Sequence, residues 1–378
     1  MIEKVRSFAK INLGLRIGAS RPDGFHELLT VYQTIALHDV IRVSIGRGTG
    51  IEIRCDDPRV PRDESNTCFK IVERAMVALR AKGRVAIEIE KHLPVQGGLG
   101  GASANAVATL IALERALRKS LTAAERLRIA AEVGSDLPLF LVGGTVLGVG
   151  RGEQVYPLSD LREMACVVVM PAIGVSTPKA FAEWDRRQGL KPPAAGLPDA
   201  ALKGGSSTGH PGELMVAPAA SMTSGKESAE LRSAGRARRP SPHTTQVPPK
   251  LTDLVGSDRI NGLGRELSAW LSEPYSSAPF RRGRAENPLL WLVRAGIEND
   301  FEQVVFPEYP ELCEGKRALL CAGAKYASLS GSGSTLFGLF ASKIAAARAA
   351  VQLRKEGWTA LATKTLTRPQ YWRRLTGS

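Results

Sequence analysis

The sequence has few cysteines and no long hydrophobic run. The cysteines are Cys55, Cys68, Cys166, Cys313 and Cys321. Because they are scattered and none has C-x-x-C spacing, they argue against a disulfide framework or a structural zinc site, and they fit a reducing cytosol. The longest apolar stretch, residues 137–149, is too short to span a bilayer and contains proline and glycine. We expect a cytoplasmic protein with no membrane partner and no signal peptide.

Acidic residues are also scarce relative to basic ones: 37 Asp and Glu stand against 51 Lys and Arg, a net charge of +14. Such a charge attracts nucleic acids or small anionic molecules. Residues 186–250 contain ten Lys and Arg against four Asp and Glu, so this stretch carries +6 of the total. It is rich in Pro, Gly, Ser and Ala and has no aromatic side chain on which a base would stack. We interpret it as a disordered insertion or long surface loop.

The familiar phosphate-binding loops are missing. The glycine-rich stretch 94–108 is no Walker A loop, because no lysine occurs between Lys91 and Lys119, and it lacks the Rossmann spacing. Instead, a strand pattern at 85–89 is followed by four glycines within 97–101 and then by an Ala/Leu-rich helical pattern. A glycine loop that opens a helix presents unpaired N–H groups and predicts a phosphate cradle. A flexible turn before a buried helix is the alternative.

Further candidate residues lie near the N-terminus. Residues 10–17 alternate as a half-buried strand does, with Lys10 and Asn12 on one face. Arg-Pro-Asp-Gly at 21–24 is a strong turn signal, and His26 comes shortly after it. Taken singly, Lys10 is most simply a solvated lysine and His26 a surface histidine, but two polar groups on one strand face also suit a binding site.

Two more candidate segments lie towards the middle and the end of the chain. Asp136 follows a helix predicted at 122–133, whose Thr122 and Glu125 form a capping box. We expect Asp136 in a loop before an apolar, glycine-rich strand, where an isolated Asp is often only a turn former. Residues 327–340 read as strand, Gly/Ser turn and strand, which is either a second anion contact or a plain hairpin.

The other expected elements are strands at 41–45, 51–54, 164–170 and 358–365, helices at 66–81, 176–185, 260–272, 288–320 and 342–356, and a basic C-terminal tail. Asn66 is the expected N-cap of the helix at 66–81, which Gly83 should close.

Together these segments resemble the GHMP kinase superfamily. Its hallmarks are a lysine-bearing first strand, a P-x-x-x-G-L-G loop before a helix and a C-terminal Gly/Ser turn, matched here by 9–13, 94–105 and 330–334. Within the superfamily, Arg-Pro-Asp-Gly-Phe-His-Glu-Leu, Gly-Ser-Asp-Leu-Pro-Leu-Phe and Glu-Asn-Asp-Phe-Glu resemble the branch that phosphorylates 4-diphosphocytidyl-2-C-methyl-D-erythritol in the non-mevalonate isoprenoid route.

The resemblance implies a two-domain α+β fold. Residues 1–160 would form an N-terminal α/β domain resembling a ribosomal-protein fold, with the ATP loop and the catalytic residues. Residues 161–378 would form a ferredoxin-like α/β sandwich that contains the low-complexity insertion at about 186–250. The implied cofactors are ATP and Mg²⁺, the implied partner is a small-molecule substrate rather than a nucleic acid, and the implied assembly is a monomer or homodimer.

The resemblance also implies residue roles. Asp136 would take the proton of the substrate hydroxyl, and Lys10 would neutralise charge on the transferred phosphoryl group. The ATP-binding residues would be Asn66, Pro94, Val95, Gln96, Gly97, Gly98, Leu99, Gly100, Gly101, Ala102, Ser103 and Ala104, with Ser103 near magnesium. The substrate-binding residues would be Asn12, Phe25, His26, Thr177, Phe181, Gly331, Ser332 and Gly333. Phe25 and His26 would hold the cytosine ring, with Phe181 stacked on its other side.

Three features depart from the family pattern. Phe25 stands where tyrosine is common, Ala104 stands where many members have a second serine, and the segment at 186–250 is longer than the usual connection. The alternative functions are a GHMP kinase for homoserine, mevalonate or a sugar, a kinase-derived protein without activity, and a basic nucleic-acid-binding protein.

Overall fold

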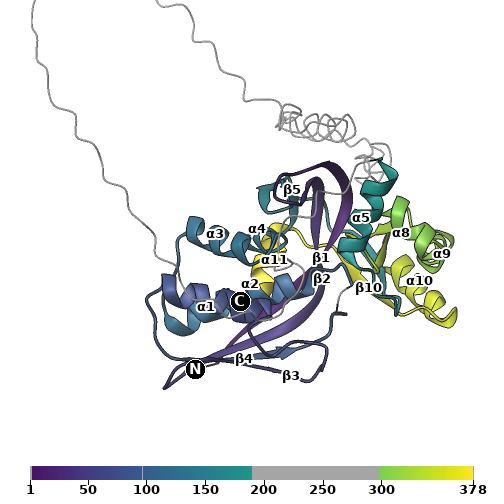
Figure 1. Cartoon of the computed structure of the whole chain (residues 1–378). Helices are drawn as coiled ribbons and strands as arrows, with labels where there is room; N and C mark the ends of the chain where they lie inside the picture. The colour runs from purple at the N-terminus through teal and green to yellow at the C-terminus, as the bar shows by residue number, and fades with distance from the viewer. Residues whose placement is uncertain (1, 96, 190–297, 378) are drawn as a thin grey trace, which may run out of the picture. The chain divides into compact units, whose positions relative to one another are not determined.

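Two β-sheets, each covered by helices, make up the described part of the chain in the computed structural model, which comprises residues 2–95, 97–189 and 298–377 (Figure 1). The strands are β1 (Ile2–Ser20), β2 (His26–Gly46), β3 (Ile51–Cys55), β4 (Arg84–Glu90), β5 (Thr145–Val149), β6 (Gln154–Pro157), β7 (Ala165–Val169), β8 (Tyr326–Leu329), β9 (Leu336–Phe340) and β10 (Ala360–Lys364). The helices are α1 (Thr67–Ala78), α2 (Gly101–Leu117), α3 (Ala123–Val133), α4 (Leu137–Val142), α5 (Thr177–Arg187), α8 (Glu302–Glu308), α9 (Pro310–Cys321), α10 (Lys343–Lys355) and α11 (Arg368–Leu375).

The first sheet has the strand order β3-β4-β2-β5-β6, and β1 also pairs with β2. The strands β1 and β2 form a long antiparallel hairpin closed by the predicted turn, where Gly24 takes a φ of 80°. The apolar residues of these two strands contribute to the core of the first sheet and to the apolar cluster between the two sheets. The strands are long enough to contact both. Leu15 of β1 exchanges backbone hydrogen bonds with the segment at Glu298 and Asp300.

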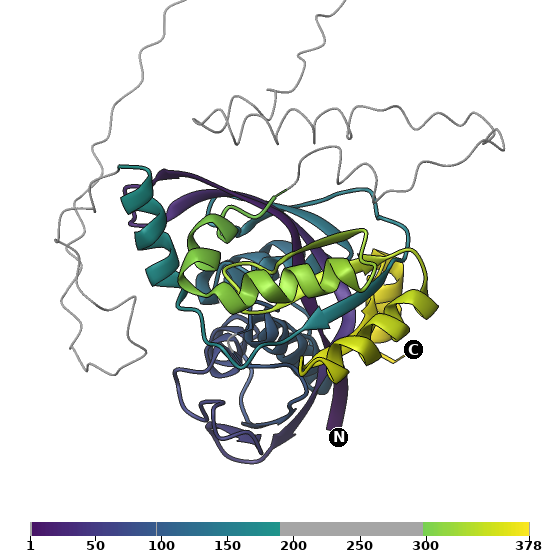
Figure 2. The same ribbon diagram turned by 90° about the vertical axis from the view of Figure 1, so that its right-hand side faces the viewer.

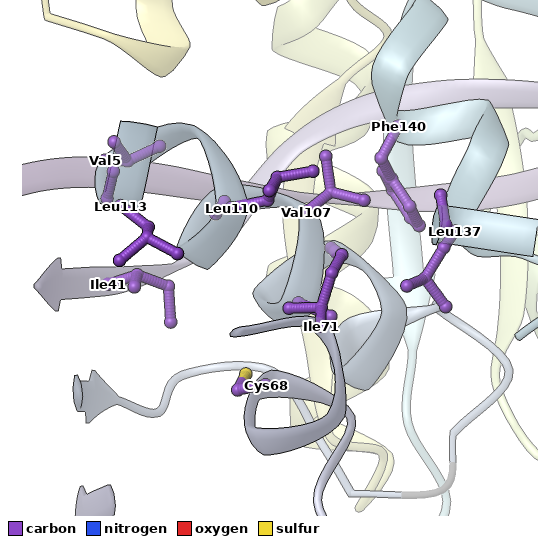
Figure 3. Close-up of a cluster of buried hydrophobic side chains, with 14 of the residues drawn as sticks. Val5, Ile41, Cys68, Ile71, Val107, Leu110, Leu113, Leu137 and Phe140 are labelled. Carbon is purple, nitrogen blue, oxygen red and sulfur yellow. The ribbon is translucent and has the colours of Figure 1, made fainter. Parts of the chain in front are cut away.

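Helices α1, α2 and α3 lie on the first sheet and enclose its core. Figure 3 shows Ile41 of the sheet with Ile71 of α1, and with Leu110 and Leu113 of α2, in one cluster of fully buried side chains. Phe140 of α4 closes the same cluster. Because each such side chain contributes about 1.5–3 kcal/mol on burial, this cluster fixes α2, and with it the preceding glycine loop, against the sheet.

The second sheet is fully antiparallel, with the strand order β10-β7-β9-β8. In chain order this is 4-1-3-2, so the ferredoxin-like organisation implied by the resemblance is confirmed. Helices α8, α9 and α10 pack on this sheet, at the other end of the described molecule from α1 and α3 (Figures 1 and 2). A further apolar cluster, with Ile11, Leu29, Val168 and Phe337 among its members, joins the two sheets.

The domain boundary expected at residue 160 stays a prediction. The last strand of the first sheet ends at Pro157 and the first strand of the second begins at Ala165. However, α11 at the C-terminus returns to the first sheet, where Tyr371 and Leu375 are buried in its core.

Two local predictions are wrong, and two are incomplete. Residues 137–142 form the helix α4 rather than a strand, because Pro138 suits a first helical turn and a six-residue apolar run has no decisive period. The strand predicted at 41–45 is confirmed, but it is the end of the much longer, 21-residue β2. Helix α1 ends at Ala78, before Gly83. The basic tail forms α11, which Thr367 and Gln370 begin with a capping box.

The strands predicted at 51–54, 85–89 and 164–170, the helix at 122–133 and the strand–turn–strand at 327–340 are confirmed within a residue or two. The helix predicted at 260–272 and residues 190–250 of the expected insertion lie outside the described residues, as does the start of the segment at 288–320. None of the helices in the described ranges has both the length and the hydrophobicity that a membrane crossing requires.

Candidate active site

Lys10 is a buried lysine near the middle of β1. Its side chain and that of Asn12 share one face of β1, as the alternation predicts, but both are buried, with 3% and 2% of their surfaces exposed. The Lys10 ammonium donates a 2.7 Å hydrogen bond to Asn12 Oδ1. Asn12 Nδ2 in turn donates to the Thr30 hydroxyl at 2.8 Å. A buried ammonium needs such partners, so this network holds the Lys10 side chain in one orientation.

Asp136 is the second partner of Lys10. It lies at the N-cap position of α4, and its Oδ2 is 3.4 Å from the Lys10 ammonium. The Asp136 side chain is about one third exposed, whereas that of Lys10 is almost fully covered. The structure therefore brings together the two residues predicted to be catalytic, and it leaves the carboxylate accessible from the cleft.

Tyr32 completes this group, and the sequence analysis missed it. Its hydroxyl donates a 3.1 Å hydrogen bond to Asp136 Oδ1, and the Lys10 ammonium lies 5.6 Å from the centre of its ring. Burial, reinforced by the Asp136 charge, raises the pKa of Tyr32 well above its ordinary value of 10.0, so the phenol stays a donor. A Cβ at Gly148 or Gly152 would meet Tyr32 atoms at 2.5 Å, so both positions need glycine.

The glycine loop lies directly beside Lys10. The Lys10 amide donates to Leu99 O at 3.0 Å, which ties the loop to β1. Gly98 and Gly100 have φ values of 74° and 68°, in the left-handed region that favours glycine. Gly100 is the N-cap of the 17-residue α2 and has no side chain to cap it. The first N–H groups of α2 are therefore available to an anion, as the phosphate-cradle prediction requires.

The C-terminal Gly/Ser turn packs against the same loop. The Ser330 hydroxyl donates to Gly98 O at 3.0 Å, and a Cβ at Gly98 would come within 2.2 Å of Ser330 O. Gly331 approaches Lys10 and Asn12 so closely that an added Cβ would lie 3.4 Å from each polar atom. The three motifs named by the resemblance, far apart in the sequence, thus meet at one place.

Asn299 gives the Glu-Asn-Asp-Phe-Glu segment a structural role. Its buried Nδ2 donates to Leu329 O at 2.9 Å and to Gly331 O at 2.7 Å, which fixes the Gly/Ser turn. The carboxylate of Asp300, next in the chain, accepts from the amide of Ile17 at 2.9 Å. This segment therefore positions the turn, and its Phe301 also lines the cleft, edge-on to Phe181.

At the other end of the cleft lies an aromatic and imidazole group. His26 Nε2 is 2.7 Å from Asp185 Oδ1, and the His26 ring stacks on Phe181 with centroids 4.8 Å apart and planes inclined by 10°. This contact leaves no room for a base between these two rings. Phe25 is 42% exposed and lies under the guanidinium of Arg151 at 4.8 Å. A base held between Phe25 and Phe181 stays a prediction.

A single cavity of about 610 Å³ joins these two ends. Of the predicted site residues, all line it except Gln96, Ala104 and Gly333. Gln96 lies outside the described residues. The Ala104 side chain points into the core of the first sheet instead, and a Cβ at Gly333 would meet only Leu329. The Thr177 hydroxyl is 2.7 Å from that of Ser332, so the two substrate-end predictions lie together.

The part of the cavity near the glycine loop contains the predicted Asn66 and also Lys91, which the sequence analysis did not single out. Asn66 lines the cavity, but its Oδ1 accepts from the Cys68 amide and its Nδ2 donates to Pro61 O, so it is first the N-cap of α1. Lys91 forms a buried 2.7 Å ion pair with Asp39. Lys91 and Asp39 are far apart in the sequence and meet only through strand pairing, so the sequence spacing did not predict this ion pair.

The cleft thus combines a phosphate cradle, a buried lysine and an accessible carboxylate. Residues 66–144 match the family of GHMP kinases N terminal domains, and residues 286–358 match the GHMP kinases C terminal family. Fold and site together define a GHMP kinase, a class of ATP-dependent kinases.

Curated relatives narrow this assignment. The 4-diphosphocytidyl-2-C-methyl-D-erythritol kinase of Solibacter usitatus is 32% identical over 98% of this chain and 92% of its own length. The kinase of the same name from Acaryochloris marina is 33% identical over 92% of this chain and 89% of its own. The chain belongs to the 4-diphosphocytidyl-2-C-methyl-D-erythritol kinase family.

Solved structures agree on the fold. A crystal structure of 4-(cytidine 5'-diphospho)-2C-methyl-D-erythritol kinase aligns with a TM-score of 0.60 at 23% identity, over 96% of this chain and 98% of that one. A homoserine kinase from Cytophaga hutchinsonii aligns with a TM-score of 0.59 at 18% identity, over 97% and 95% of the two chains. At these identities the likeness concerns the fold alone.

Proposed function

We propose that this chain transfers the γ-phosphate of ATP to the 2-hydroxyl of 4-diphosphocytidyl-2-C-methyl-D-erythritol. The observation that carries the proposal is the Lys10–Asp136 pair, which lies in one cavity with the phosphate cradle and with the His26 group. The membership of this chain in the family of these kinases supports the same substrate.

The ATP phosphates are assigned to the glycine loop and the start of α2. Phosphoryl transfer requires mainly positioning and stabilisation of charge, which backbone N–H groups and a buried ammonium provide. Lys10 would stabilise the charge on the transferred group, and its bond to Asn12 keeps it in place. Asp136 would accept the proton of the attacking hydroxyl while Tyr32 holds its other oxygen.

A magnesium ion fits this donor set. Mg²⁺ is usually held by one or two carboxylates together with substrate phosphates rather than by a protein cage. Within the described ranges there is no cluster of three or more His, Cys, Asp or Glu side chains, and Asp136 and the Ser103 hydroxyl both line the cleft. Together with the ATP phosphates, the Ser103 hydroxyl would hold the ion, which supplies neutralisation of phosphate charge when bound.

The cytidyl group is assigned to the His26 end. Because His26 Nε2 lies against Asp185, a proton on that nitrogen leaves Nδ1 as an acceptor. An exocyclic amine, which cytosine has and uracil lacks, is the matching donor. Phe181 and Phe25 supply flat apolar surface beside it. We propose a cytosolic location for the reaction, which the five free thiols support.

The site of phosphorylation tests this proposal. The purified chain is incubated with ATP, Mg²⁺ and 4-diphosphocytidyl-2-C-methyl-D-erythritol, and the product is examined by ³¹P NMR and mass spectrometry. A new phosphomonoester on the 2-hydroxyl is expected. A new phosphate at another hydroxyl would move the chain to a different kinase activity, and the homoserine and mevalonate kinases that share the fold supply the next substrates to test.

A further inference from the structure

A second cavity of about 440 Å³ lies outside the catalytic cleft. It is lined by residues from the end of α2, the start of α3, the end of α4 and the C-terminal α11. Ile111, Leu127, Leu141, Val142 and Trp372 give it apolar walls. Its volume is that of ordinary small-molecule sites, which are mostly apolar with a few polar groups that orient the ligand.

The polar lining of this cavity is strongly basic. It contains Arg115, Arg118, Lys119 and Arg126 with the carboxylate of Glu114, and Arg115 forms an ion pair with Glu3 at 3.2 Å. Arg126 is bound to Glu114 at 3.0 Å. Lys119 donates to Leu79 O at 3.0 Å and to Arg80 O at 3.3 Å. Within the described ranges it forms no ion pair with a carboxylate.

Arg118 stands out among these cations. It ends α2 with a φ of 52°, a left-handed conformation that is unusual for arginine. Arg118 is exposed, and within residues 2–95, 97–189 and 298–377 its guanidinium has no hydrogen-bond or ion-pair partner. A guanidinium of this kind beside an apolar wall is suited to the bidentate binding of a phosphate.

The wall of the cavity is mechanically connected to the catalytic carboxylate. Helix α4 begins after Asp136 and ends at Leu141 and Val142, both of which line the cavity. Helix α11 holds the far end of α4, because Trp372 Nε1 donates to Val142 O at 3.0 Å and the Tyr371 hydroxyl donates to Phe140 O at 2.7 Å. A ligand that moves Leu141 or Trp372 therefore acts on the short helix whose first turn carries Asp136.

We propose that this cavity is a regulatory site for a soluble amphiphilic anion, a short hydrocarbon chain that carries a phosphate or diphosphate. The head group would bind at Arg118 and Lys119, and the chain would lie against Leu127, Leu141 and Trp372. Binding of the ligand would change the position of Asp136 through α4.

The test uses isopentenyl diphosphate as the probe, with isopentenol and inorganic diphosphate as its two halves. Binding is measured by calorimetry with the catalytic cleft filled by a non-hydrolysable ATP analogue, and this arm does not rest on the proposed function. The whole probe is expected to bind at least about tenfold more tightly than either half, because both walls contribute. Equal binding of inorganic diphosphate, no binding of the probe, or binding only to phosphatidic acid vesicles would overturn the proposal.

Matched variants locate the binding. Arg118→Gly removes the guanidinium and relieves the left-handed backbone, and Arg80→Gly does the same at φ 46° outside the cavity. Likewise, Leu127→Asp places a carboxylate in the cavity, whereas Leu320→Asp changes a similarly exposed leucine on α9. We expect about tenfold weaker probe binding in the two cavity variants and unchanged binding in the two controls. Equal effects in both sets would contradict the assignment.

The regulatory effect of the ligand is tested separately, by measuring kcat. Saturating isopentenyl diphosphate is expected to change kcat in the unaltered protein and in Arg80→Gly, with much less effect in Arg118→Gly. Binding that leaves kcat unchanged would refute the link through α4. If the chain had no kinase activity at all, the proposed function would fail, while the calorimetric result would still stand.

Discussion

The Tyr32 hydroxyl donates a 3.1 Å hydrogen bond to Asp136, the carboxylate assigned as the catalytic base. The bond joins the middle of β2 to the start of α4, and the same carboxylate is 3.4 Å from Lys10 through its other oxygen. Each oxygen of Asp136 therefore has its own partner. This arrangement aims the carboxylate into the cleft and is the basis of the first prediction.

Tyr32→Phe should lower kcat with little change in the KM for ATP. The ring that fills the space beside Gly148 and Gly152 remains, and only the bond to Asp136 is lost. A hydrogen bond to a charged group contributes about 1.5–3 kcal/mol, so a fall of about 10- to 100-fold is expected from initial rates. Tyr326→Phe is the matched control, because its hydroxyl bonds to Leu13 O away from the carboxylate. A Tyr32→Phe enzyme with normal kcat would remove Tyr32 from the mechanism.

Asp136→Asn should abolish most turnover while nucleotide binding is kept. The amide retains the size of the carboxylate but cannot take up the substrate proton, so a loss of about 10²- to 10⁴-fold in kcat is expected. Calorimetric titration with an ATP analogue measures binding separately. Asp23→Asn, on the turn between β1 and β2, serves as a control at a half-exposed carboxylate. Substantial turnover by Asp136→Asn would show that the base lies elsewhere.

Gly98→Ala should destabilise the protein and raise the KM for ATP. The residue has a positive φ, which costs alanine about 1 kcal/mol or more, and its Cβ would collide with Ser330 O. Gly357→Ala isolates the first effect, since Gly357 also has a positive φ, of 93°, but nothing lies near its added Cβ. Thermal unfolding and initial rates should separate the two variants. Equal behaviour would mean that the loop does not pack on the Gly/Ser turn.

Glu163→Gln should lower stability at neutral pH by about 1–3 kcal/mol, and the difference should vanish in acid. Burial raises the pKa of Glu163, but hydrogen bonds from Lys364 and Lys343 lower it by more, from 4.5 to about 2. The stabilisation is therefore present above pH 4.5 and is lost as the pH falls towards 2. Urea unfolding across this range measures it, with Glu73→Gln as an exposed control. A difference that persists at pH 2 would contradict the cause given.

The sequence pattern predicted those parts of the site that lie within one segment. Lys10 and Asn12 follow from strand alternation, and the loop before α2 follows from its glycines and the helix after it. The pairing of Lys10 with Asp136 came only from the resemblance, because two side chains from separate segments leave no trace in spacing.

The missed features depend on long-range register or on local sequence that fits two structures. Tyr32 faces Asp136 only because the β1–β2 hairpin pairs it with Asn12. The run at 137–142 satisfies a strand pattern as well as a helical one, and tertiary contacts with α11 decide in favour of α4. Fold class was therefore accessible from sequence, whereas the residues that orient the base were not.

The most direct test of the central claim compares ATP turnover with and without the cytidyl group. ADP release is measured with Mg²⁺ and either 4-diphosphocytidyl-2-C-methyl-D-erythritol or 2-C-methyl-D-erythritol 4-phosphate, for the unaltered chain and for His26→Ala. The account predicts turnover only with the cytidyl substrate and a raised KM for it in His26→Ala, with His92→Ala unchanged as the exposed control. Equal turnover of both compounds, or a His26→Ala enzyme with normal KM, would contradict it.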